Sequence, residues 1–210
     1  MMPCKNQNKL VVVILLLLFC LVCANNGGKQ EKRTSQGIEG KKVVMVVGQR
    51  WFKDVELNIP RARFEKEGMI VTIASSKLDT AEGSEGSKVK PDVLIDDLNV
   101  SDFDALVFIG GTGVKRDFWN NPKAHAVVRE AAEQGKVVAA ICWGPVVLAN
   151  AGILEGKRAT GHTAENAHET LKSKGCIYTG ESVTVDGNII TAFGPSSADS
   201  FAVAIIEALK

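Results

Sequence analysis

The chain has 210 residues, of which 45% are hydrophobic and 23% are charged, enough apolar material for one core of ordinary size. Its 25 basic and 24 acidic residues leave a formal net charge of +1, so there is no excess positive charge to attract nucleic acid. The composition therefore excludes an intrinsically disordered chain and predicts no nucleic-acid partner.

The first 24 residues have the pattern of an export signal. The stretch MMPCKNQNK carries two lysines, and the run from Leu10 to Ala24 that follows it is uncharged. The run resembles the apolar part of a signal peptide, with Ala24 as a small residue at the cleavage position. It is shorter than the roughly 20 residues of a membrane span, which favours cleavage over anchoring. We predict that residues 1–24 are a signal peptide or an N-terminal anchor, that the domain is exported, and that any membrane attachment is made only through residues 10–24.

The next segment, residues 25–41, reads NNGGKQEKRTSQGIEGK. It is polar and rich in glycine and lysine, a composition typical of a flexible tether. We therefore place the folded domain at residues 42–210.

Four short apolar runs in that domain are typical of strands buried on both faces of a parallel sheet. They cover residues 42–48, 69–75, 105–111 and 137–142. Helical patterns lie between them at residues 54–68 and 121–135, and each pattern ends at a glycine, which helix C-caps favour. The alternation of strand and helix indicates βαβ units.

The C-terminal part of the chain departs from this alternation. The sequence VTVDGNIIT reads as a hairpin around Asp186 and Gly187, so residues 177–192 are expected to form a small antiparallel addition. Residues 197–210 have the pattern of a closing amphipathic helix. The predicted fold class is α/β, a doubly wound, mostly parallel sheet with helices on both faces and no second domain.

Cys142 stands at the carboxyl end of the run 137–142, and Trp143, Gly144 and Pro145 open the next helix. Ligands of open α/β sheets bind beyond such strand ends, and strand, sharp turn and helix together form a nucleophile elbow. The helix N-terminus is expected to lower the pKa of the thiol. A strand cysteine is more often a small buried hydrophobe, but the glycine and proline that follow favour a nucleophile.

Four stretches resemble the DJ-1/PfpI superfamily, and together they span residues 42–210. They read FKDVELNIPRARFEKEGMIVTIAS, DALVFIGG, AAICWGPVVLANAGILEGKRATGH and GPSSADSFAVAIIEALK. The resemblance implies a flavodoxin-like sandwich that forms a homodimer or higher homo-oligomer. It also implies a reactive cysteine on the elbow, with a glutamate from the first helix beside it.

The same resemblance assigns the other site residues. Glu56 in DVEL matches the glutamate, and Gly111 in FIGG matches the glycine whose N–H points at the cysteine. The N–H of Trp143 would complete an oxyanion site. PfpI-type proteases carry histidine after the cysteine, where this chain has Trp143, so the DJ-1-like subset fits better. That subset places a histidine in a later loop, and His162 in ATGH matches it.

From the residues alone, Glu56 reads equally well as a surface position of an amphipathic helix, and His162 as a solvated loop residue. A carboxylate beside a thiolate repels it, so the pair is stable only if Glu56 holds a proton. Trp51 and Trp119 lie in segments expected near strand tips, where either could form a pocket wall, but such aromatic residues more often serve packing, so we do not assign them to the site.

The site predicts a glyoxalase- or deglycase-like hydrolase in which the Cys142 thiolate attacks small α-oxoaldehydes or their adducts, while Glu56 and His162 move protons. The alternative is a non-enzymatic oxidative-stress sensor or chaperone in which Cys142 is oxidised to sulfinic acid. A PfpI-type cysteine peptidase is the third reading. The expected partners are a small carbonyl substrate and further copies of the chain.

No cofactor and no metal are predicted. Cys142, His162 and His168 lack the paired spacing of zinc ligands, and the glycines around Gly111 lack a phosphate-loop spacing. Cys142 and Cys176, the cysteines of the folded domain, are expected to be free thiols.

Overall fold

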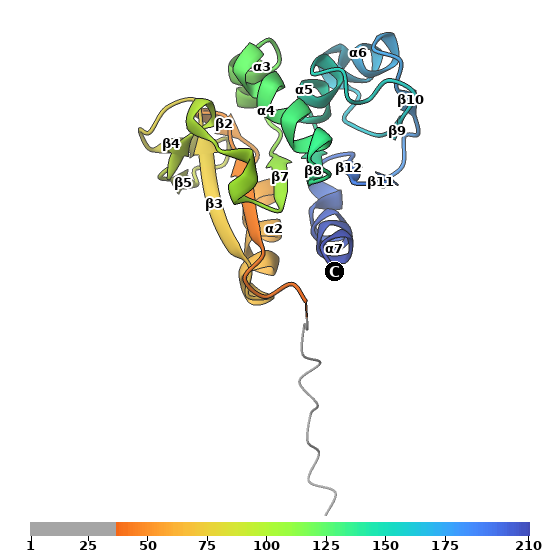
Figure 1. Cartoon of the computed structure of the whole chain (residues 1–210). Coiled ribbons are helices and arrows are strands. Elements are labelled where there is room, and N and C mark those ends of the chain that lie inside the picture. The colour runs from red at the N-terminus through yellow and green to blue at the C-terminus, as the bar shows by residue number, and fades with distance from the viewer. Residues whose placement is uncertain (1–36) are drawn as a thin grey trace, which may run out of the picture. The chain divides into compact units, whose positions relative to one another are not determined.

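The computed structural model describes residues 37–210, and the predicted leader and most of the predicted tether lie outside them (Figure 1). The described part opens with a turn in which Ile38 is buried and the N–H of Gly40 donates to the carbonyl of Gly68 at 2.9 Å. Packing against the folded part therefore begins a few residues before Lys42, the predicted start of the domain. One apolar residue in a polar segment gives too weak a pattern to reveal this packing.

A seven-stranded sheet forms the centre of the domain, in the order β11-β12-β8-β7-β1-β3-β6. Its strands are β1 (Lys42–Val46), β3 (Ile70–Ser75), β6 (Val93–Leu94), β7 (Ala105–Phe108), β8 (Val137–Ile141), β11 (Val183–Asp186) and β12 (Ile189–Ala192). Neighbouring strands run parallel except in the hairpin of β11 and β12, which is antiparallel. The predicted parallel sheet is confirmed, and so is the antiparallel addition at residues 183–192, whereas residues 177 and 178 of its predicted range pair in parallel with residues 158 and 159 in a separate sheet.

Helices cover both faces of the sheet, as predicted. One face packs against α2 (Asp54–Lys66) and α7 (Ala198–Ala208). The other packs against α3 (Thr112–Phe118), α4 (Pro122–Glu133), α5 (Pro145–Asn150) and α6 (Ala167–Ser173).

Strand β1 shows how the sequence supplies both layers of the core. Side chains alternate across a strand, so Val43 and Met45 join the layer of α2 and α7, while Val44 and Val46 join that of α4 and α5. A strand with apolar groups on both faces reads as a continuous apolar run, which is the pattern that predicted it.

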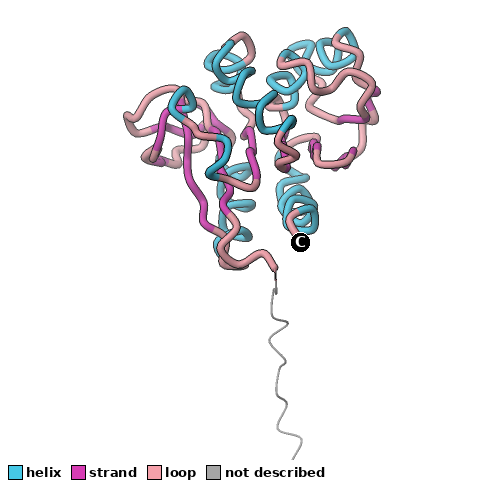
Figure 2. Tube along the Cα trace, viewed as in Figure 1, coloured by secondary structure: helices cyan, strands magenta, loops and turns pink. Residues whose placement is uncertain are grey.

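Short elements fill the remaining chain, and Figure 2 shows them set among loops. One small sheet contains β2 (Arg50–Phe52), β4 (Ala81–Gly83) and β5 (Lys88–Val89), and another contains β9 (Arg158–Ala159) and β10 (Ile177–Tyr178). The 3-10 helices are η1 (Ile95–Asp97), η2 (Val100–Asp102), η3 (Ala164–Asn166) and η4 (Pro195–Ser197). Across residues 37–210, no helix combines the length and the apolar character that a membrane crossing needs.

Candidate active site

Cys142 sits on a sharp turn directly after β8. Its φ of 63° lies in the left-handed region, which is rare for a residue other than glycine and is concentrated at functional sites. A Cβ at Gly144 would stand 2.8 Å from the carbonyl oxygen of Phe108, so only glycine lets the turn approach the sheet this closely. Helix α5 begins at the next residue, Pro145. The predicted strand–turn–helix geometry of an elbow is thus present.

Glu56 meets this elbow from α2. Its side chain is fully buried, and Oε2 accepts the N–H of Gly110 at 3.0 Å. A Cβ on Gly110 would stand 2.5 Å from Cβ of Cys142 and 2.6 Å from Oε2 of Glu56. The backbone of Gly110 therefore lies in contact with both residues, and the absence of a side chain there lets them come together. Glu56 is a buried residue beside Cys142 and not a surface position of its helix.

The pair consists of two acids in a buried setting. Burial raises the pKa of Glu56 to about 7, against the opposing effects of the Cys142 thiol, the Gly110 N–H and the charge of Lys53. Burial, followed by the charge of Glu56, also raises the pKa of the Cys142 thiol. Near neutral pH Glu56 is therefore partly ionised, and the two groups together hold between one and two protons.

The predicted lowering of the thiol pKa is wrong. Helix α5 has only six residues and starts three positions after the cysteine, so its dipole offers little help. Cys142 is only 8% exposed and has a carboxyl group as a neighbour, and both conditions penalise the thiolate.

Two backbone N–H groups act in the opposite direction. The backbone N–H groups of Gly111 and Trp143 lie next to the Cys142 thiol and lower its pKa in part. Gly111 has a φ of 97°, and a Cβ there would stand 2.3 Å from the carbonyl oxygen of Trp51. Glycine is thus required at this position for two separate reasons. The structure places both predicted donors at the reactive atom.

A pocket of about 320 Å³ opens at this site. Four predicted site residues line it, namely Gly111, Cys142, Trp143 and His162. Five further residues complete the lining, namely Trp51, Lys53, Ser84, Thr112 and Pro195. The structure therefore brings all the predicted residues together, with Glu56 buried beneath the cysteine.

Trp51, which the sequence analysis considered as a pocket wall but did not assign to the site, lines the pocket. Its side chain is 51% exposed and its φ is 60°, an unusual conformation for an aromatic residue. The guanidinium groups of Arg50 and Arg116 lie 5.7 Å and 5.4 Å from the centre of its ring. Its place three residues before the helix of Glu56 was the one available signal.

The turn between β4 and β5 forms one wall of the pocket, and the sequence did not predict it. Bonds from Asp54 help to hold this turn in place. This aspartate is buried, and its carboxylate accepts the N–H groups of Glu85 at 2.8 Å and Ser87 at 2.7 Å. The same turn supplies Ser84 to the pocket, and Glu85 forms an ion pair with Lys53. These contacts join segments far apart in the chain, so no local pattern reveals them.

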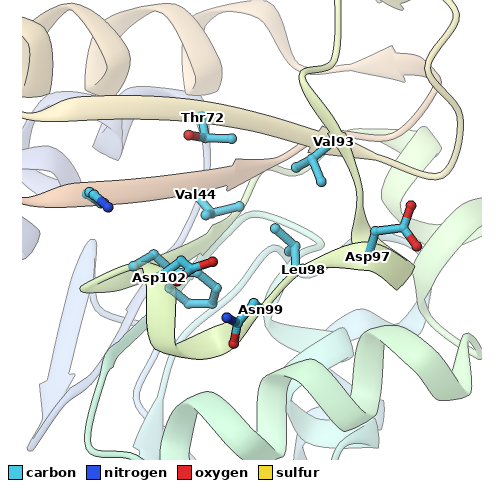
Figure 3. A pocket seen from close by; sticks show the side chains of 9 residues that line it. Val44, Thr72, Val93, Asp97, Leu98, Asn99 and Asp102 are labelled. Carbon is cyan, nitrogen blue, oxygen red and sulfur yellow. The ribbon is translucent and has the colours of Figure 1, made fainter.

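A second pocket, of about 210 Å³, lies between the sheet and the segment of η1 and η2 (Figure 3). Asp97 and Asp102 line it beside the apolar side chains of Val44 and Leu98. It has no cysteine or histidine in its lining, so the reactive chemistry belongs to the Cys142 pocket.

Cys142 and Cys176 are both free thiols, as predicted. Within residues 37–210, no group of three or more ligating side chains is placed to hold a metal ion.

Comparison with known proteins places this site in a family context. The family model for the DJ-1/PfpI family matches residues 41–208. An uncharacterised protein of Methanocaldococcus jannaschii is 42% identical, over 86% of this chain and 87% of its own. A protein named as a deglycase from Pyrococcus horikoshii is 35% identical, over 76% of this chain and 94% of its own. The crystal structure of a ThiJ/PfpI domain protein from Brachyspira murdochii superposes with a TM-score of 0.78 at 30% identity, over 81% of this chain and 97% of that one.

Proposed function

This chain belongs to the DJ-1/PfpI family, and on that premise we propose that it is a cysteine-dependent enzyme of glyoxalase or deglycase type. The observation that carries the proposal is the buried pair of Glu56 and Cys142. The N–H groups of Gly111 and Trp143 lie next to the thiol of this pair, and a pocket of about 320 Å³ opens beside it. Relatives named as deglycases support it. The substrate class is a small α-oxoaldehyde or its adduct on an amine or thiol.

The first step is addition of sulfur to the aldehyde carbon. A C–S bond forms, and the π electrons of the carbonyl move onto its oxygen while the thiol proton passes to the Glu56 carboxylate. The N–H groups of Gly111 and Trp143 stabilise the developing oxyanion. Glu56 then returns the proton to that oxygen and leaves a neutral hemithioacetal. A carboxyl pKa of about 7 suits both directions of transfer.

The next steps need no oxidant. Glu56 removes the proton from the carbon that carries sulfur, the electron pair of that C–H bond forms a C=C bond, and the electrons of the neighbouring carbonyl move onto its oxygen to give an enediolate. Glu56 then gives the proton to the neighbouring carbon, while the hydroxyl proton beside sulfur moves to the neighbouring oxygen, and the product is the thioester of a 2-hydroxy acid. Water then cleaves the thioester to a 2-hydroxy acid and the free thiol. One carbon is oxidised and its neighbour reduced, so methylglyoxal plus water gives lactate without an external redox partner.

The other two readings use the same residues. In a redox sensor, Cys142 would be oxidised to sulfinic acid and protonated Glu56 would donate to it, which the raised pKa of Glu56 favours. A peptidase is disfavoured because Trp143 occupies the position where a histidine would pair with the elbow cysteine. The pocket beside the thiol has room for a small carbonyl substrate, which supports the proposed enzyme.

Turnover by the purified protein separates these readings. Methylglyoxal is supplied without added metal or cofactor, and lactate is measured. We expect product from the wild type and from Cys176→Ser, a change at a buried thiol outside the pocket, and none from Cys142→Ser. A wild type with a reduced thiol and no product would favour the sensor, and cleavage of a peptide substrate would favour the peptidase.

We further propose that the protein is exported by its first 24 residues and works as a homodimer or higher homo-oligomer. The apolar N-terminal run supports the first proposal and the family resemblance supports the second. Light scattering on the purified protein measures the oligomer.

A further inference from the structure

The three histidines of the chain each have one ring nitrogen next to a backbone group, and this fixes which nitrogen carries the proton. Nδ1 of His162 lies 3.0 Å from the backbone nitrogen of Ala164, which donates to it. A backbone N–H can only donate, so Nδ1 must be unprotonated. The neutral imidazole then carries its proton on Nε2.

The remaining contacts of His162 leave its Nε2–H without a partner among the described residues. The half-buried side chain lines the Cys142 pocket, and its ring lies against Phe193 with 5.5 Å between ring centres. Cδ2 is 3.5 Å from the place where a Cβ of Gly194 would stand. Among residues 37–210, no hydrogen-bond partner is found for Nε2.

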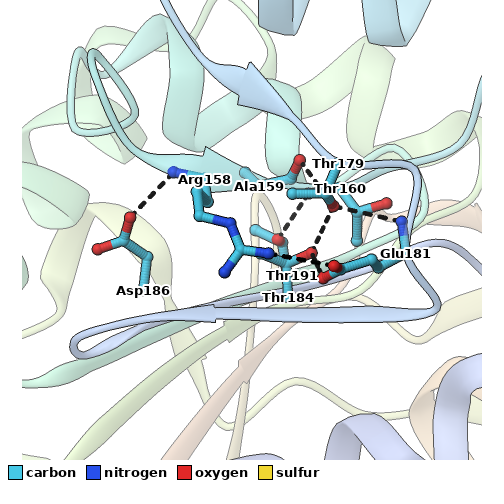
Figure 4. A network of polar contacts seen from close by, with 8 residues as sticks. All are labelled: Arg158, Ala159, Thr160, Thr179, Glu181, Thr184, Asp186 and Thr191. Carbon is cyan, nitrogen blue, oxygen red and sulfur yellow. Dashed lines mark hydrogen bonds and ion pairs between the residues drawn. The ribbon is translucent and has the colours of Figure 1, made fainter.

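The backbone that carries His162 is held on several sides. Its own N–H donates to the carbonyl of Cys142 at 2.9 Å, which ties it to the nucleophile turn. The hydroxyl of Tyr178 donates to the carbonyl of Gly161 at 2.8 Å. The N–H of Thr160 donates to Oγ1 of Thr191 at 2.9 Å, within the polar network of β9, β11 and β12 (Figure 4). These contacts fix the backbone of His162 relative to the turn that carries Cys142.

We propose that His162 acts on the substrate as a neutral hydrogen-bond donor through Nε2–H, and not as a proton acceptor. This inference rests on the proposed function and gives each group of the site a separate role in it. The N–H groups of Gly111 and Trp143 serve the carbonyl that sulfur attacks. Nε2–H serves the second carbonyl oxygen of the α-oxoaldehyde, which gains negative charge as the enediol forms. Glu56 is then the only side chain that accepts protons.

Two variants of His162 separate donation from acceptance, with methylglyoxal as the probe. The amide nitrogen of His162→Gln reaches the region of Nε2 and keeps a donor there, whereas the shorter side chain of His162→Asn matches only Nδ1. We expect the glutamine variant to retain kcat within about tenfold and the asparagine variant to lose about 100-fold, the effect of removing one oxyanion donor. Alkylation of Cys142 should proceed equally in both, which shows an intact elbow. A glutamine variant as inactive as the asparagine variant would overturn the proposal.

Nitrogen-15 NMR of the full chain reads the proton directly and requires no turnover. Nδ1 of His168 lies 3.2 Å from the carbonyl of Thr163, which can only accept, so its neutral form carries the proton on Nδ1. Nε2 of His125 lies 3.0 Å from the carbonyl of Trp119 and carries its proton there. His168 is thus an internal standard for the tautomer opposite to that of His162.

We expect the neutral His162 ring to show a protonated Nε2 and an unprotonated Nδ1, with the signal assigned by its loss in His162→Gln. A protonated Nδ1, or exchange between the two tautomers, would overturn the inference even in an active enzyme. If the wild type does not turn over methylglyoxal, the proposed function fails. The spectrum then still decides the state of His162.

Discussion

The carboxyl group of Glu56 lies beside the thiol of Cys142, and the backbone of Gly110 touches both. Two acids in one buried site cannot both ionise easily, because the second negative charge is repelled by the first. The pair therefore keeps a proton close to the sulfur. Ionisation of the pair should control the reactivity of the thiol, the pH dependence of turnover and the stability of the folded protein.

Glu56→Gln should make Cys142 easier to ionise. The charge of Glu56 raises the pKa of the thiol, and glutamine removes that charge while keeping an oxygen for the Gly110 N–H. We expect the midpoint of iodoacetamide alkylation to move to lower pH by about one unit or more. Glu65→Gln, at an exposed position of the same helix, should leave it unchanged. A higher midpoint in Glu56→Gln would mean that wild-type Glu56 is neutral and donates to the sulfur.

Turnover should follow the ionisation of Glu56. Because the carboxylate form accepts the thiol proton, kcat/KM for methylglyoxal should rise with pH and level off above a pKa of about 7. The rise should disappear in Glu56→Gln together with most of the activity. A rate that falls as pH rises through 7 would assign the active form to protonated Glu56.

The raised pKa of Glu56 should make the folded protein less stable as pH increases. This direction is opposite to that of an acid whose pKa is lowered by folding. The pKa of Glu56 is raised from 4.5 to about 7 in the folded protein, so over this range the unfolded chain loses the proton and the folded protein keeps it. Ionisation thus favours unfolding as pH increases, by about 3 kcal/mol in total. Glutamine cannot ionise.

Urea unfolding at several pH values measures this effect. The free energy of unfolding of the wild type should fall relative to that of Glu56→Gln between pH 4.5 and about 7, and then stay constant until the cysteine thiol of the unfolded chain ionises near about pH 8.5. A difference between the two proteins that does not change with pH would show that Glu56 has an ordinary pKa.

The sequence predicted the long elements well. Each long strand and helix ends within three residues of its predicted bound, because continuous apolar runs and terminal glycines are local signals. Cys142 was found for the same reason, from the glycine and proline after it. Trp51 belongs to a three-residue strand and Ser84 to a polar turn, and tertiary bonds between segments far apart in the chain, such as those of Asp54 to the turn, hold them in place. The thiol pKa was missed because it depends on burial, which the neighbours of Cys142 in the chain do not determine.

The mature protein isolated from its host should begin near Asn25. The uncharged run from Leu10 to Ala24 follows two lysines and ends in a small residue, which favours cleavage over anchoring. N-terminal sequencing of the native protein measures this. An intact Met1 in a membrane fraction would instead identify the segment as an anchor.

Gly110→Ala should separate folding from function. The new Cβ would stand 2.5 Å from Cβ of Cys142 and 2.6 Å from Oε2 of Glu56, so the nucleophile and its proton acceptor must move apart. Overpacking of this kind costs about 1 to 3 kcal/mol of stability, and a displacement of about 1 Å at a reacting group costs about 100-fold in rate. The control is Gly135→Ala, where φ is 69° and a Cβ meets no atom within 4 Å. Its backbone strain of about 1 to 2 kcal/mol should lower the melting temperature similarly and leave turnover intact. Full activity in Gly110→Ala would show that catalysis does not need the close approach of Glu56 to Cys142.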